Sequence, residues 1–117
     1  MYKFYYNEVL DESPKQAREQ ERTALEKSIA LLQDAQQKGA SSREAVEAFI
    51  YLDRFWKILL EDLAHPDNGL PQSLKASLIS VGIWVLREIE ALRLGRNHSF
   101  DALIEVNVLI RDGLKEH

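Results

Sequence analysis

A short polar break between two apolar runs constrains the fold of this chain more than any other feature. The break covers residues 64–71, and the two runs beside it carry the only two tryptophans, Trp56 and Trp84. Pro66 cannot donate a helical hydrogen bond and disfavours helical geometry at the residue before it, so the first run is expected to end as a helix at about Ala64. The pattern predicts a helical hairpin in which both tryptophans belong to the core.

The corner of this hairpin is expected to be shaped by a small group of residues. Asn68 and Gly69 tolerate positive φ, and Pro71 has the fixed φ that suits the first position of a helix. Asp62 lies in the last turn of the helix that precedes the corner, and Leu70 lies within the corner itself. We therefore interpret these five residues as structural, with Asp62, Asn68, Gly69 and Pro71 shaping and capping the corner.

Capping signals place the remaining helix boundaries. Ser13 with Gln16 and Ser41 with Glu44 each match a capping box, and Gly39 is a typical C-terminal stop. Gly95 and Gly113 are expected to follow the last two helices in the same way, and Ser99 to cap the fourth. The predicted helices cover residues 14–38, 42–64, 71–94 and 100–112.

The apolar positions predict how these helices pack. The third helix has apolar residues on two faces, one of them made by Ile79, Ile83 and Leu86, which indicates that it lies at the centre of the fold. Gly82 costs about 1 kcal/mol relative to alanine in a helix interior, so close approach by another helix is expected there. Residues 15–23 of the first helix are almost all polar and are expected to be largely solvated.

Four helices with short links predict an all-α, elongated, four-helix bundle-like domain. A length of 117 residues fits one domain, comprising an N-terminal arm at residues 1–12 and a helical bundle at residues 13–114. The arm is rich in aromatic residues. These rings either pack back onto the bundle or dock a partner. The aromatic residues of the arm are Tyr2, Phe4, Tyr5 and Tyr6.

Asn107 falls among the apolar positions of the last helix. A buried amide needs hydrogen-bond partners, so Asn107 either lies at the edge of the core with its amide paired or is held for a partner. With the four aromatic residues of the arm, it completes the set of candidate partner-binding residues.

Composition and motifs exclude several classes of function. A net charge of −4 without a segregated basic patch disfavours nucleic-acid binding, and no apolar run approaches the ~20 residues that span a membrane. There is no cysteine, no pair of histidines at metal-binding spacing and no glycine-rich phosphate loop. We therefore expect a cytoplasmic protein that is not an enzyme and has no cofactor, metal or membrane partner.

Short motifs follow one another in order over about half of the chain. They are Phe55-Trp56-x-x-Leu59-x-x-Asp62-Leu63, Asn68-Gly69-Leu70-Pro71, the run of residues 74–85, and Leu103-Ile104-Glu105-Val106-Asn107 with Ile110 and Gly113-Leu114. This ordered set resembles the FlaF family of alphaproteobacterial flagellar regulators. Phe55 stands where leucine is common in that family, and Val106 stands where isoleucine is common.

The resemblance implies a cytoplasmic protein needed for flagellin production and export. It also implies two partners: flagellin itself, and FlbT, a counteracting regulator that represses flagellin translation through its mRNA. Because an acidic helical bundle can cover an amphipathic helix in an apolar groove, we interpret the chain as a flagellin-binding chaperone. The groove is expected near the aromatic arm and the polar first half of the helix at residues 14–38. The alternatives are a post-transcriptional regulator acting on flagellin mRNA or through FlbT, and a homo-oligomeric interaction module.

Overall fold

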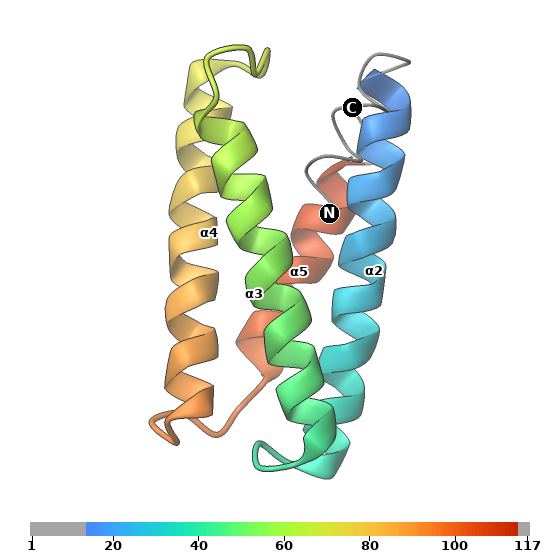
Figure 1. Cartoon of the computed structure of the whole chain (residues 1–117), viewed down its shortest axis with the longest axis vertical. Coiled ribbons are helices and arrows are strands. Elements are labelled where there is room, and N and C mark those ends of the chain that lie inside the picture. The colour runs from blue at the N-terminus through green and yellow to red at the C-terminus, as the bar shows by residue number, and fades with distance from the viewer. Residues whose placement is uncertain (1–13, 115–117) are drawn as a thin grey trace.

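The computed structural model of this chain describes residues 14–114, and side chains between residues 17 and 113. All regular secondary structure in this part of the chain is α-helical, which confirms the all-α prediction. The molecule extends over 40 × 24 × 24 Å, as expected for an elongated bundle (Figure 1). The predicted arm at residues 1–12 lies outside the described residues. The helices are α2 (Pro14–Lys38), α3 (Arg43–Ala64), α4 (Gln72–Arg93) and α5 (Asp101–Leu114).

Two glycines end helices as predicted. Gly39 follows the last residue of α2 with φ 99°, and Gly95 lies just beyond α4 with φ 75°. Glycine adopts this left-handed backbone without the steric cost that a Cβ brings. Gly113 differs, because α5 continues through it to Leu114 where an end at Asp112 was predicted.

The predicted N-cap of α3 is wrong by one residue. Ser42, not Ser41, precedes the first helical residue, and its Oγ accepts a hydrogen bond from the backbone N–H of Ala45 at 3.1 Å. The backbone N–H of Ser42 also donates to the carbonyl of Gly39 at 3.1 Å. This turn closes the short loop, so Ser42 is the serine that lies at the helix start.

The corner between α3 and α4 reverses the chain through a side chain rather than through positive φ. Neither Asn68 nor Gly69 has a left-handed backbone, contrary to the prediction. Instead the Asn68 amide donates to the carbonyl of Asp62 at 3.2 Å and accepts from the N–H of Leu70 at 3.1 Å. Pro71 precedes the helix as its N-cap and is not its first residue.

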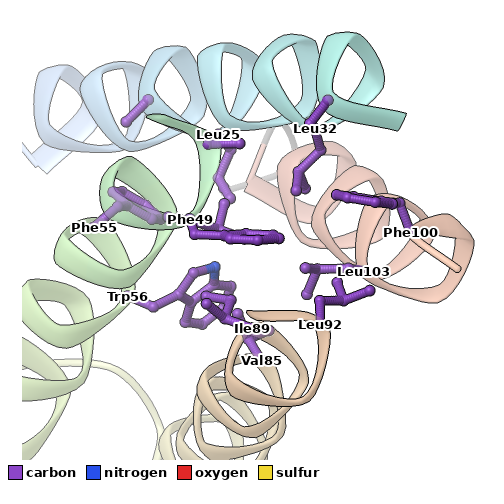
Figure 2. Packing of buried hydrophobic residues seen from close by; sticks show 14 of the residues in the cluster. Leu25, Leu32, Phe49, Phe55, Trp56, Val85, Ile89, Leu92, Phe100 and Leu103 are labelled. Carbon is purple, nitrogen blue, oxygen red and sulfur yellow. The ribbon is translucent and has the colours of Figure 1, made fainter. Parts of the chain in front are cut away.

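The core lies where α3 packs against α2 and α4, and where α5 packs against α2. Figure 2 shows α2, α3, α4 and α5 all contributing side chains to it, with Trp56 of α3 directed toward Val85 and Ile89 of α4. Trp56 has no exposed surface, and the rings of Phe49 and Phe100 stack at 5.9 Å. The largest fully buried hydrophobic side chains are Trp56, Leu25, Leu32, Leu52, Leu92, Leu103 and Val85.

The polar first half of α2 is not as solvated as predicted. Ala17 is buried, and Glu21 is only 2% exposed although it is ionisable. The guanidinium of Arg18 donates to the Glu21 carboxylate at 2.9 Å, which offsets part of the cost of burying that charge. The inner face of this half of α2 therefore belongs to the folded body.

The predicted central place of α4 is also wrong. Among the described helices, α4 packs closely only against α3, and in Figure 1 it lies at the side of the bundle. Its inner face is buried through Gly82, Val85, Ile89 and Leu92, while Ile83 on the other face is 43% exposed. Of the second apolar face, Ile83 lies at the surface, whereas Ile79 and Leu86 are partly buried and pack against the core.

Gly82 marks the closest approach of α3 and α4, as the sequence predicted. A Cβ at this position would lie 2.7 Å from Cδ2 of Leu60 and 3.1 Å from Cε3 of Trp56. Leu60 is partly exposed and has room to move, but Trp56 is fully buried and does not. The indole therefore sets the limit on what fits at position 82.

Gly82→Ala is expected to lower the free energy of unfolding by about 1 kcal/mol, because overpacking of about 1–3 kcal/mol outweighs the gain in helix propensity. Gly113→Ala is the matched control. No atom lies within 4 Å of its added Cβ, so this change is expected to raise stability by about 0.5–1 kcal/mol. Urea denaturation measures both variants. Stabilisation by Gly82→Ala equal to that of the control would contradict the close contact.

Candidate partner-binding groove

An apolar groove with a cavity of about 150 Å³ lies at the end of the bundle where the corner is found. Four helices contribute to it: the first turns of α2, the end of α3, the start of α4 and the end of α5. We call this feature the corner groove. Its lining residues are Arg18, Glu21, Leu59, Asp62, Leu63, Asn68, Leu70, Leu74, Leu78, Leu109, Ile110 and Gly113.

The corner groove exists because α4 and α5 pack on different partners. α4 lies against α3 and α5 lies against α2, so the two helices stand apart at this end (Figure 1). At the other end they approach, and Leu92 of α4 lies beside Leu103 of α5 in Figure 2. The two helices therefore diverge from the loop between them toward the end at which the corner groove lies.

The walls of the corner groove are aliphatic. Leu74 and Leu78, one turn apart on α4, form one wall and are only partly buried. Leu109 and Ile110 of α5 belong to the other wall, and Leu109 is 62% exposed. The apolar side chains of the two walls are therefore partly accessible from outside the bundle.

The polar lining of the groove is confined to its α2 and corner sides. Arg18 and Glu21 form a partly buried ion pair on α2, and the Asn68 amide also lies 3.3 Å from Oδ2 of Asp62. These groups are hydrogen-bonded within the chain. An apolar groove with satisfied polar groups at one side is suited to the apolar face of an amphipathic helix.

The predicted site residues fall into separate places. The aromatic residues of the arm lie outside the described residues, so their part in partner binding stays a prediction. Three corner residues, Asp62, Asn68 and Leu70, line the corner groove, whereas Gly69 and Pro71 are exposed beside it. The aromatic residues concerned are Tyr2, Phe4, Tyr5 and Tyr6.

Asn107 lies in the core and not on a surface that faces a partner. It has no exposed surface, and its Oδ1 accepts a hydrogen bond from the indole N–H of Trp56 at 3.0 Å. Its amide N–H donates to the carbonyl of Leu103 at 2.7 Å. The structure thus favours the paired amide over the partner-binding role. Trp84 is partly buried and packs against the same core.

The sequence analysis missed the groove walls. Leu74 and Leu78 stand at the i, i+4 spacing of a helix face, and Leu109 and Ile110 are apolar residues near the end of the last helix. The sequence shows that these four residues are apolar, but their spacing indicates only which of them share a helix face. Which face remains uncovered depends on how helices distant in sequence are arranged.

For the ionisable residues in the described part of the chain, two properties matter: whether they meet the requirements of a metal site and whether they line the groove. No group of three or more His, Cys, Asp and Glu residues there could hold a metal ion. A hydrogen bond and the charge of Arg93 lower the pKa of Glu90, and burial raises the pKa of Tyr51, but neither group lines the groove. None of the helices over residues 14–114 is long and apolar enough to cross a membrane.

Comparison with known proteins gives one match. A family model described as "Flagellar protein FlaF" matches residues 2–114, which is nearly the whole chain. A search of curated proteins finds no match, and neither does a search of solved structures. The match also covers residues 2–54, which precede the first of the motifs that carry the resemblance.

Proposed function

The chain belongs to the FlaF family of flagellar proteins, and from this premise we propose that it is a flagellin-binding chaperone that promotes flagellin synthesis and secretion. The corner groove is the observation that carries the proposal. Flagellin termini are amphipathic helical segments that must not assemble inside the cell. A protein that covers the apolar face of such a segment keeps it unassembled until export.

The size and lining of the corner groove support this proposal. A cavity of about 150 Å³ lined by aliphatic side chains can hold a benzene-sized group, and the corner groove has this volume. An amphipathic helix would insert one large apolar side chain there and lay its next turns between Leu78 of α4 and Leu109 of α5. The net charge of −4 favours a complex that stays soluble.

Calorimetric titration of the full chain with monomeric flagellin tests the proposal. We expect a dissociation constant in the micromolar range or below, corresponding to about −8 kcal/mol or better. The heat capacity change on binding should be negative, because apolar surface is buried. The control titrates the same protein with flagellin that has already assembled into filaments, in which the assembly segments are covered.

Absence of binding to monomeric flagellin would overturn direct capture. The alternative would then be a post-transcriptional regulator that acts on flagellin mRNA or through FlbT. A gel shift with flagellin leader RNA, and a pull-down with purified FlbT, would test these two routes separately. Light scattering of the chain alone would test the homo-oligomeric module.

A further inference from the structure

We propose that the aromatic arm of residues 1–12 occupies the corner groove when no partner is bound, so that the chain covers its own binding surface. This inference deepens the proposed function, and its regulatory part rests on it: flagellin must displace the arm to bind. The occupancy itself depends only on the groove and on the arm. The two parts are therefore tested separately below.

The place where the chain enters α2 puts the arm next to the groove. α2 begins at Pro14, and the groove lining includes Arg18 and Glu21 on its first two turns. At about 1.5 Å per residue, Arg18 lies about 6 Å along the helix axis from Pro14. The arm thus starts at the rim of the groove and not at the far end of the bundle.

The length of the arm is sufficient to reach every part of the groove. The eight residues from Tyr6 to Pro14 span at most about 28 Å when extended. The groove is built from the ends of four helices in a body whose two shorter extents are 24 Å each. Rings at Tyr5 and Tyr6 therefore have enough chain to cross from α2 to the walls formed by α4 and α5.

The chemistry of the arm matches the chemistry of the groove. Tyr2, Phe4, Tyr5 and Tyr6 bring four aromatic rings within five positions of the sequence. The groove accepts a benzene-sized group, since a cavity of its volume holds one.

Covalent attachment makes even a weak contact effective. A segment joined to its site by a short linker experiences an effective concentration in the millimolar range. The arm would then fill the groove in most molecules although the free peptide would bind weakly. A flagellin helix with more anchors and a larger buried area would still displace it.

Disulfide trapping tests the occupancy, and the chain is suited to it because it contains no cysteine. Asn7→Cys in the arm is combined with Leu74→Cys in the groove wall. The control combines Asn7→Cys with Ala76→Cys, which is exposed, lies half a turn away on the same helix and does not line the groove. Each cross-linking rate is divided by the reactivity of the α4 cysteine of that pair, measured in a variant that carries this cysteine alone.

We expect the monomeric disulfide to form about tenfold faster with Leu74→Cys than with Ala76→Cys, as an arm held in the groove requires. Equal normalised rates would overturn the proposal. Disulfide-linked dimers in place of monomers would also overturn it, because they would assign the groove to a second copy of the chain. A non-reducing gel separates these products.

Adding monomeric flagellin separates this inference from the proposed function. Suppression of the fast cross-link to the control rate supports both. A fast cross-link that flagellin does not suppress supports the arm in the groove and removes flagellin from that site. Equal cross-linking rates together with normal flagellin binding overturn the arm and leave the chaperone function intact.

Removing two rings gives an independent result. In the full chain, Tyr5→Ala combined with Tyr6→Ala is expected to raise the affinity for flagellin about tenfold, because the competing segment is weakened. Unchanged affinity would overturn the proposal. Affinity reduced by more than tenfold would also overturn it, because the rings would then bind flagellin directly, as the sequence analysis predicted.

Discussion

Replacing Trp56 with alanine is expected to lower the free energy of unfolding by about 3–5 kcal/mol, the range for large aromatic residues in a core. Trp56 has no exposed surface and lies edge-on to Phe55, with ring centroids 5.9 Å apart. It also touches α4 through Gly82. Its loss leaves a cavity between α3 and α4 and leaves the Oδ1 of Asn107 without its indole donor.

Two milder variants separate the packing from the hydrogen bond. Trp56→Phe keeps much of the ring but removes the N–H, and Asn107→Ala removes the acceptor. A double-mutant cycle on this pair is expected to give a coupling energy of about 0.5–3 kcal/mol. Urea denaturation measures all four proteins. A cost of Trp56→Ala below about 1 kcal/mol, as at surface positions, would contradict its place in the core.

Closing the corner groove with charge is expected to produce the largest change in partner binding. Leu74→Glu and Leu109→Glu place a carboxylate on each wall. Combined, they should weaken flagellin binding at least about 100-fold, or about 2.7 kcal/mol, because a binding anchor is lost and a charge is desolvated. Calorimetric titration under the conditions used for the unaltered chain measures the effect.

These two positions are chosen so that the fold is retained. Leu74 lies in the first turn of α4, where a negative charge interacts favourably with the helix dipole. Leu109 is 62% exposed, so its change removes little core packing. The control carries Ser73→Glu and Ala102→Glu, which add the same charge at exposed positions of the same two helices outside the groove lining. Equal weakening by the control would mean that charge, and not the groove, governs binding.

The candidate site was only partly predictable from the sequence. The corner between α3 and α4 was predicted from the sequence, and three of its residues line the groove. The sequence analysis expected the groove near the aromatic arm and the first half of α2, where the sequence has aromatic residues and few apparent core partners. The first half of α2 contributes Arg18 and Glu21 to the lining of the corner groove. It assigned the apolar residues of α4 to a central helix, and so treated as core the wall that Leu74 and Leu78 leave open.

The sequence by itself determined what depends on neighbouring residues: four helices, their ends at Gly39 and Gly95, and the hairpin at the corner. Proline and glycine act on the backbone within a few residues, so such signals are readable locally. Only the tertiary structure decided that α4 lies at the side of the bundle and that the indole of Trp56 donates a hydrogen bond to Asn107, 51 residues away. Helical periodicity indicates which residues share a face, whereas the helix that covers that face is determined by packing among the helices of residues 14–114.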